Sequence, residues 1–487
     1  MYRRILTIDE VALIPDELKE VMRDYTSAGF EIYLVGGGVR NILVGKVPEN
    51  SDLTTNATPE QSMKILKRRD PFYNNDFGTV SFNVKVGEGD ELYEITTYRS
   101  EKEYSDFRRP DEVTWGKTLE EDVVRRDLTV NAIVIGEKGG KYELIDMVDG
   151  LKDFESGVIR AVGDPEKRFG EDALRMMRAI RFAARLGFKI EEKTLEAISN
   201  QSGLLSKISR ERVRDELFRI LVTDYPADGV QLMISTGLMK DIMPELLEGR
   251  GIAQGGHHQL TVLDHAIEAL RNCPSSDVLV RLAALIHDIG KPRSRRFKCR
   301  SCEKLYKEID VEIYKCEVCG FIQDTRKMIT FYGHEVIGAR MTEEIVKRLR
   351  LTSKQSEKMV TMVRQHMFAY QPEMTDAAIR RLIRKIGKEN ISDMIMLRIA
   401  DRKGSGSRTT SWRFMELQKR IGEQLYEPME VKDMAVNGKD VMEVLGVPPG
   451  PVIGKTLNAL FEEVIEDTSK NNRDYLIGRI RDLGRIS

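Results

Sequence analysis

The hydrophobic pattern of this 487-residue chain changes once, near Gly150, and this change limits the folds that the chain can adopt. Before Gly150, short apolar stretches typical of strands ("EIYLV", "FGTVSFNVKV", "ELYEITTYR") alternate with helical segments such as "TPEQSMKILKRR". After it, one amphipathic helical segment follows another, beginning with "EDALRMMRAIRFAARLGF". The pattern predicts an α/β head of mixed sheet and helices, then a mostly α-helical remainder in which the strands stop, apart from one insert.

The same pattern predicts four domains and one small insertion. We expect a head at 1–150, a helical neck at 151–255, a second helical domain at 256–405 and a helical tail at 406–487. Short strand-like pieces between cysteine pairs predict a β-type insert at 293–327, inside the second helical domain.

Charge and hydropathy exclude several classes of protein. A net charge of -1 and a pI near 6.7 exclude a generally basic protein, so any nucleic-acid contact must come from local clusters. Stretches such as "KILKRR", "RRLIRKIGK" and "EIVKRLRL" are candidates, although each is also typical of a solvated helix face. No apolar run reaches about 18 residues, and the charged start "MYRRILTIDE" does not resemble a signal peptide. We therefore expect a cytoplasmic protein without membrane contact.

Four of the five cysteines predict a zinc site. Cys299, Cys302, Cys316 and Cys319 have the spacing Cys-x2-Cys-x13-Cys-x2-Cys, which suits a tetrahedral thiolate site with no open position for catalysis. Such a zinc ion would have a structural role or a role in docking RNA. The alternative is four unrelated reduced cysteines. With Cys273 isolated, the pattern favours a reducing compartment over a disulfide scaffold.

A glycine run follows the first predicted apolar strand. In "LVGGGVRN", Gly36 to Gly38 allow backbone N–H groups to approach phosphates, and Arg40 can bind them bidentately. Asp52 follows about a dozen residues later, and Glu94 lies on a strand that could run alongside. Carboxylates with substrate phosphates are ligands that Mg²⁺ prefers, so the two could hold Mg²⁺ against a triphosphate. Without these carboxylates, a plain tight turn would explain the glycines equally well.

Two further motifs complete a recognisable set. "RRDLTVNAI" (125–133) and "EDALRMMRAIRF" (171–182), together with "GGGVRN" and "NSDLTTNATPE", resemble the bacterial class II tRNA nucleotidyltransferases, the CCA-adding enzymes, in the polymerase-beta-like superfamily. The segment from "MAVNGKDVMEVLGVPPG" to "NNRDYL" continues the likeness into the tail. The resemblance implies Mg²⁺-dependent addition of C, A or both to the tRNA 3′ end from CTP and ATP. A bacterial poly(A) polymerase is a related alternative, disfavoured because a basic tail is absent.

The resemblance also implies roles for individual residues. It places nucleotide-binding roles on Gly37, Arg40, Arg126, Asp127, Asn131, Asp172, Arg175, Arg178 and Arg181, beside Asp52 and Glu94, which are the candidate catalytic metal ligands on chemical grounds. Asp172 and Arg175 are three residues apart on one helix face of the neck, where a carboxylate and a guanidinium can read the Watson–Crick edges of cytosine and adenine. A surface ion pair is the alternative for this pair taken alone.

Two positions depart from the family pattern. The family has Asp where this chain has Asn41 and Asn50, and the residue at the second position is a catalytic metal ligand. A neutral amide oxygen binds Mg²⁺ less well than a carboxylate does. Losing one preorganised charge commonly costs on the order of 10²-fold in rate. Asn50 therefore predicts a weakened transfer site.

A second set of metal-binding residues follows in the helical half. The chain resembles the HD phosphohydrolases in the order of six residues: His265, His287, Asp288, His334, His366 and Asp401. They provide enough ligands for two divalent ions, with Mn²⁺, Ni²⁺ and Co²⁺ as candidates, although single histidines on apolar helices are usually packing residues. An alternative function is therefore an HD-type phosphohydrolase or cyclic phosphodiesterase acting on RNA 3′ ends, with a non-catalytic tRNA-binding head. A non-catalytic RNA-binding protein would need both metal sites to be empty.

Overall fold

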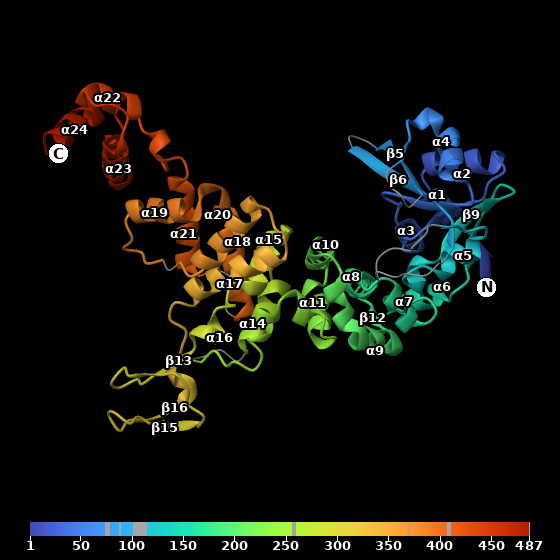
Figure 1. The fold of residues 1–487 in the computed structure, drawn as a ribbon, viewed down its shortest axis with the longest axis horizontal. Coiled ribbons are helices and arrows are strands. Elements are labelled where there is room, and N and C mark those ends of the chain that lie inside the picture. The colour runs from blue at the N-terminus through green and yellow to red at the C-terminus, as the bar shows by residue number, and fades with distance from the viewer. Residues whose placement is uncertain are drawn as a thin grey trace. The chain divides into compact units, whose positions relative to one another are not determined.

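The computed structural model describes residues 1–73, 78–86, 89–100, 114–255, 260–368, 370–406 and 411–486. The chain divides into two compact units, Met1–Ile242 and Met243–Ser487, and Figure 1 shows the elements of each. The division into four domains stays a prediction. Phe77, at the start of one predicted strand, lies outside the described residues.

An eight-stranded sheet forms the head. Its order is β1 (Tyr2–Ile5), β10 (Lys141–Asp146), β9 (Val134–Lys138), β2 (Ile32–Val35), β3 (Asp52–Thr55), β6 (Gly89–Thr97), β5 (Thr79–Val86) and β4 (Phe72–Tyr73). Neighbours are antiparallel except for β3 and β6, which are parallel. A short antiparallel pair, β7 (Arg99–Ser100) with β8 (Thr114–Trp115), lies apart from this sheet.

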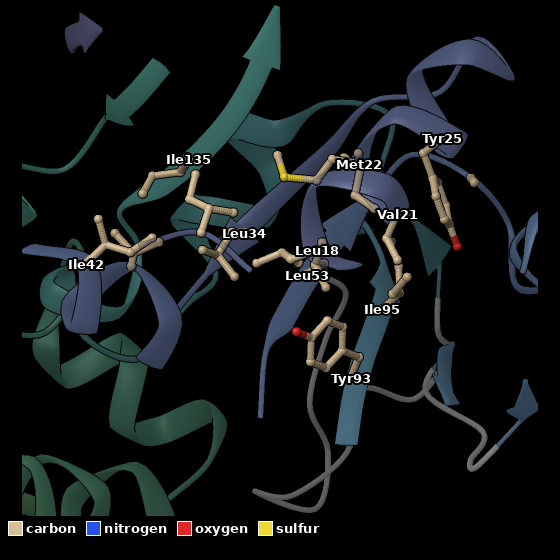
Figure 2. Packing of buried hydrophobic residues seen from close by; sticks show 14 of the residues in the cluster. Leu18, Val21, Met22, Tyr25, Leu34, Ile42, Leu53, Tyr93, Ile95 and Ile135 are labelled. Atoms are coloured by element: carbon tan, nitrogen blue, oxygen red, sulfur yellow. The ribbon is translucent and has the colours of Figure 1, made fainter. Parts of the chain in front are cut away.

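Apolar side chains of one helix pack against the sheet. Helix α2 (Asp16–Ser27) buries Leu18, Val21, Met22 and Tyr25 in a cluster with residues of β2, β3, β6 and β9 (Figure 2). Full burial of an aliphatic side chain such as Leu18, Val21 or Met22 contributes about 1.5–3 kcal/mol to the free energy of unfolding. The other helices of the head are α1 (Ile8–Ala12), α3 (Gly37–Leu43), α4 (Pro59–Ile65), α5 (Leu119–Val124) and α6 (Gly150–Glu155). The predicted α/β head with a mixed sheet is confirmed.

Helices dominate the chain from Pro165 to Ile242. They are α7 (Pro165–Glu171), α8 (Leu174–Leu186), α9 (Glu192–Gln201), α10 (Arg210–Leu221), α11 (Pro226–Ser235) and α12 (Met239–Ile242). The expectation that strands stop after Gly150 is wrong, because β11 (Val158–Ile159) pairs in parallel with β12 (Lys189–Ile190). Two residues per strand are too few to produce a recognisable alternation in sequence.

The second unit is helical. Its helices are α13 (Pro244–Leu247), α14 (Val262–Arg271), α15 (Val278–Ile286), α16 (Lys291–Ser294), α17 (His334–Arg348), α18 (Ser353–Gln365), α19 (Asp376–Ile386), α20 (Ile391–Gly404), α21 (Trp412–Gln424), α22 (Gly438–Leu445), α23 (Pro451–Glu466) and α24 (Arg473–Ile486). Among the described helices of the whole chain, none is both long and apolar enough to cross a membrane.

The predicted β-type insert is present, but its sheet extends past the predicted end at residue 327, because β17 (Ile329–Thr330) pairs with β13 (Arg296–Lys298). Strands β14 (Leu305–Tyr306), β13 (Arg296–Lys298) and β17 (Ile329–Thr330) form a three-stranded antiparallel sheet in that order. Strands β15 (Ile313–Lys315) and β16 (Ile322–Asp324) form a separate hairpin. The last strand of the insert ends four residues before the first histidine of α17.

Candidate functional site

Two carboxylates lie side by side in the centre of the head sheet. The parallel pairing of β3 and β6 aligns Asp52 with Glu94, so both side chains leave the same face. Desolvation by the surrounding protein, followed by repulsion from Glu94, raises the pKa of Asp52 to about 6. Two adjacent carboxylates, one of which disfavours the charge of the other, fit a divalent cation that prefers oxygen ligands, such as Mg²⁺.

Asn50 is engaged with the backbone of β6. Its Oδ1 accepts a hydrogen bond of 3.0 Å from the Leu92 N–H, and its φ of 46° lies in the left-handed region. Asn tolerates this conformation better than most residues. Asn50 does not line the pocket that contains Asp52 and Glu94. Its proposed contribution to metal binding stays a prediction.

A pocket of about 570 Å³ surrounds the carboxylate pair. Seven predicted site residues line it: Asp52, Glu94, Arg126, Asp127, Asp172, Arg175 and Arg178. Five further charged residues in its wall were not singled out from the sequence: Arg99, Arg125, Arg212, Glu216 and Arg219. Three of these are spaced i, i+4 and i+7 along α10, a stripe that the sequence does contain. The excess of arginine suits a polyanionic ligand.

Asp122 is a buried residue that holds two arginines of this wall in place, and it was not predicted from the sequence. Its carboxylate accepts hydrogen bonds from Arg125 at 3.0 Å, Arg126 at 2.8 Å and the Thr54 hydroxyl at 3.1 Å. Burial opposes its ionisation, but Arg126 and Arg125 hold the pKa of Asp122 well below its usual range. Asp122 thus connects two pocket arginines to strand β3, two residues beyond Asp52.

Arg40 lies in a buried network. It is 7% exposed, its guanidinium lies 4.9 Å from the Phe182 ring centroid, and it donates to Asn131. Asn131 in turn donates to Asp127 at 3.1 Å, and Arg178 donates to the other oxygen of Asp127 at 2.6 Å. Of these residues, Asp127 and Arg178 also line the pocket. Arg40 and Asn131 therefore help to hold Asp127 in place without lining the pocket themselves.

Asp172 and Arg175 have separate partners. Asp172 accepts from Arg212 at 3.0 Å, whereas Arg175 donates to Glu171 at 2.7 Å and to the Arg125 carbonyl at 3.2 Å. The polar edges assigned to nucleotide reading are thus already hydrogen-bonded within the protein. A nucleotide base would either replace these contacts or use the remaining donors of Arg175 and acceptors of Asp172.

Two remaining predicted residues lie at the margins of the site. Gly37 begins α3, directly after Gly36, whose φ of 65° favours glycine. A Cβ on Gly36 would lie 3.6 Å from Asp52 Oδ2, so the glycine loop passes against the carboxylate. Arg181 pairs with Glu216 at 3.2 Å, and burial lowers the pKa of Arg181 to about 10.

The second site brings the predicted histidines and aspartates together. His265 Nε2 and His287 Nε2 lie 3.1 Å apart, and His334 Nε2 and His366 Nε2 lie 3.2 Å apart. Asp288 lies between the two pairs. Its Oδ2 is 3.3 Å from His265 and 3.2 Å from His287, whereas its Oδ1 is 3.3 Å from His334 and 3.5 Å from His366.

The outer nitrogens fix how these rings are oriented. Nδ1 lies within hydrogen-bond distance of a backbone carbonyl in three of them: His287 with Ala284 at 2.9 Å, His334 with Phe331 at 2.8 Å and His366 with Val363 at 2.7 Å. If Nδ1 carries the proton in each ring, the paired Nε2 lone pairs face one another. Asp401 Oδ1, 3.3 Å from His265, adds a second carboxylate. Buried nitrogen and carboxylate donors arranged in this way fit divalent metal ions.

The four clustered cysteines fit zinc. Sγ of Cys299 lies 3.6 Å from that of Cys319, and Sγ of Cys302 lies 3.6 Å from that of Cys316. Zn–S bonds of about 2.3 Å in a tetrahedron separate the sulfurs by about 3.8 Å. The Tyr306 hydroxyl lies 3.1 Å from the Cys316 sulfur, and this contact is the main reason that the pKa of Cys316 falls to about 6. A thiolate is the form that binds metal.

Each basic stretch contains an arginine that pairs within the protein. Arg69 pairs with Glu17 at 2.5 Å and Asp24 at 2.6 Å, and Arg348 pairs with Glu245 at 2.5 Å. In "RRLIRKIGK", Arg380 is only 5% exposed and donates to the backbone carbonyls of Ile465 and Glu466 at the end of α23. These contacts favour the interpretation as ordinary helix faces.

Several known families match parts of the chain. Residues 32–160 match "Poly A polymerase head domain", and residues 255–403 match "HD domain". Residues 187–249 match "Probable RNA and SrmB- binding site of polymerase A", and 337–480 match tRNA nucleotidyltransferase domain 2. Asp52 and Glu94 lie in the segment that matches the poly(A) polymerase head domain, and the histidine cluster lies in the segment that matches the HD domain.

Similarity along nearly the whole chain decides the family. The CCA-adding enzyme of Levilactobacillus brevis is 30% identical over 472 residues, which cover 96% of this chain and 99% of that protein. The chain belongs to the CCA-adding enzyme family. The resemblance predicted from the sequence motifs is thereby confirmed.

Other CCA-adding enzymes extend this comparison. That of Ligilactobacillus salivarius is 45% identical over 230 residues, an alignment that spans 47% of this chain and 55% of that protein, about half of each. The solved CCA-adding enzyme of Bacillus stearothermophilus, in complex with CTP, is 25% identical with a TM-score of 0.68 and 99% coverage of both chains. These similarities agree with the fold class predicted from the sequence.

Proposed function

We propose that this CCA-adding enzyme family member transfers CMP, AMP or both from CTP and ATP to the 3′ end of tRNA, using the pocket around Asp52 and Glu94. The observation that supports this most directly is the alignment of these two carboxylates beside an arginine-rich wall. Asp52 and Glu94 would hold Mg²⁺, which when bound supplies charge stabilisation for phosphoryl chemistry. Asn50 leaves the site one carboxylate short of the family pattern.

The pocket residues have distinct roles in this proposal. Arg126 and Arg178 bind and orient the triphosphate, and the buried contacts of Asp122 and Asp127 hold these two guanidinium groups in place. The tRNA 3′ hydroxyl attacks the α-phosphate, pyrophosphate leaves, and one ester bond replaces one anhydride bond. Asp172 and Arg175 exchange their protein partners for the polar edge of the base.

The direct test is incubation of the purified protein with tRNA lacking its 3′ end, Mg²⁺ and labelled CTP or ATP. Incorporation of label into the tRNA is the expected result. Absence of incorporation at high enzyme concentration, with nucleotide still bound, would contradict transfer and favour a head that only binds tRNA.

A second activity is favoured by the histidine cluster. We propose that it hydrolyses phosphate esters, because buried ligands for two divalent ions lie beside a pocket of about 650 Å³. Lys291, Arg398 and Arg402 line this pocket and can bind phosphate oxygens. Bound Mn²⁺, Ni²⁺ or Co²⁺ would supply an activated water. Bis-p-nitrophenyl phosphate and 2′,3′-cyclic nucleotides are the test substrates, and inertness toward all of them with each metal would contradict this activity.

The cysteine cluster is proposed to hold one structural zinc ion. Anaerobically purified protein is expected to contain one zinc per chain, and Cys316→Ser is expected to lose most of it, because three thiolates leave a tetrahedral site incomplete. Elemental analysis measures the content. Cys273→Ser, outside the cluster, is the matched control and should retain zinc. Wild-type protein without zinc would contradict the site.

A further inference from the structure

One wall of the pocket beside the histidine cluster is formed by the end of the insert. Residues 329–333 are consecutive, all line this pocket, and lead directly into His334. The first two of them form β17, which pairs with β13 at Phe297 and Arg296. The position of this wall therefore depends on the sheet of the insert.

The same strand β13 leads into the cysteine cluster. Lys298 ends β13, and Cys299 follows it as the first cysteine. The ammonium group of Lys298 lies 5.9 Å from the ring centroid of Tyr332 in the pocket wall. Backbone hydrogen bonds of 2.9 Å between Cys299 and Lys304, and between Glu303 and Cys299, close the turn that presents the first cysteine pair.

Phe331 connects this wall to a predicted metal ligand. Its carbonyl lies 2.8 Å from His334 Nδ1, where it can accept the proton that fixes this ring with Nε2 facing His366. Such outer partners of metal-binding histidines orient the ring, and removing them typically costs about 10–100-fold in metal affinity or activity. A shift of β17 would therefore move the Phe331 carbonyl, which follows directly after β17, and with it the ring of His334.

The insert has little apolar core to hold this arrangement by itself. Ile313, Val318 and Ile322 are each more than half exposed, whereas Cys299 and Cys316 are at most 1% exposed. Direct polar contacts between its two halves include the Arg300 N–H to Gln323 Oε1 at 3.0 Å. Small modules of this kind usually depend on a metal or disulfides for stability.

We propose that the insert is a zinc ribbon that positions the pocket of the histidine cluster: zinc bound by the four cysteines would join the turn after β13 to the β15–β16 hairpin, which leads into β17, and would so fix Tyr332, Phe331 and His334. This inference rests on the phosphohydrolase proposed above and assigns the insert to that site rather than to nucleotide transfer. Tyr332 and Phe331 act as positioning residues, since their contacts reach the substrate pocket or the metal ligand from outside.

The test compares wild type, Cys319→Ser and the control Cys273→Ser. Loss of zinc in Cys319→Ser is expected to lower kcat/KM for bis-p-nitrophenyl phosphate with Mn²⁺ by about tenfold or more. Backbone amides of 329–334 should exchange hydrogen faster, and nucleotide addition should match wild type. A zinc-free variant with unchanged exchange at 329–334 and unchanged hydrolysis would overturn the proposal.

A second variant separates the wall from zinc itself. Lys298→Ala retains all four cysteines but loses both the contact with Tyr332 and the ion pair with Glu303 at 2.8 Å. With zinc content confirmed by elemental analysis, it is expected to raise KM more than it lowers kcat, and Glu303→Gln, which removes only the ion pair, should keep the wild-type KM. Unchanged KM would contradict a role for this contact. If wild type hydrolyses no ester, the hydrolase proposal fails, while zinc-dependent exchange at 329–334 and Mn²⁺ affinity by equilibrium dialysis still decide the positioning role.

Discussion

Asn50→Asp is expected to raise the rate of CMP or AMP addition to tRNA by about 10²-fold, the usual effect of one preorganised catalytic charge. An aspartate at this position can still accept the hydrogen bond from the Leu92 N–H, so the backbone around β6 should remain in place. The added charge would lie two residues before Asp52. The measurement is the single-turnover rate with tRNA lacking its 3′ end.

Two further variants define what this result means. Asp52→Asn should abolish addition, because it removes one member of the aligned pair with Glu94. Asn56→Asp is the matched control: Asn56 also accepts a backbone N–H, that of Glu31 at 2.8 Å, but it follows the opposite end of β3 from Asp52. An Asn56→Asp rate equal to that of wild type is expected.

A different outcome would favour the second proposed function, ester hydrolysis at the histidine cluster. If Asn50→Asp leaves addition at background while nucleotide still binds, the loop does not place the new carboxylate near the α-phosphate. A displacement of about one ångström is enough for such a failure. The head would then act by binding tRNA, and hydrolysis at the histidine cluster would be the main chemistry.

Asp288→Asn is expected to lower ester hydrolysis by about 10²-fold or more, because one carboxylate faces both histidine pairs. The neutral isostere keeps the shape of the side chain and should leave transfer by the head unchanged. Hydrolysis of bis-p-nitrophenyl phosphate and Mn²⁺ content are the measurements.

The controls for this prediction come from the same domain. Asp264→Asn changes a carboxylate on α14 that caps its own helix end through Thr261, and should hydrolyse at the wild-type rate. Of the four histidines, Asp401 approaches only His265 and His287, and it also pairs with Arg398 at 2.8 Å, so Asp401→Asn is expected to cause a smaller loss. Equal rates for wild type and Asp288→Asn would refute the role of this residue.

Local signals explain which features were predictable from sequence. Thr58 and Pro59 begin α4, and Gln61 completes a capping box that can be read directly from the chain. The cysteine spacing likewise depends on residue type and separation alone. The grouping of the histidines and aspartates, which lie far apart in the chain, was instead implied by the resemblance to the HD phosphohydrolases, and the structure brings the four cysteines, and the histidines with Asp288, together.

Long-range contacts explain what was missed. The burial of Arg40 depends on Phe182 and Asn131, far along the chain, and the partner of Asn50 is the backbone of Leu92. Pocket residues Arg212 and Arg219 lie on a helix whose charged stripe looks like an ordinary solvated face. Neither spacing nor composition specifies which helix faces the sheet.

The parallel pairing of β3 with β6 also determines when the transfer site can form during folding. Asp52 and Glu94 are 42 residues apart in the chain, and a parallel pair cannot form through a tight hairpin. Contacts across such separations form late, because the entropy of closing the intervening chain is lost before the pairing is gained. The carboxylate pair should therefore appear together with the complete sheet. Binding of a divalent cation by the head would then follow the same refolding rate constant as the burial of its apolar core.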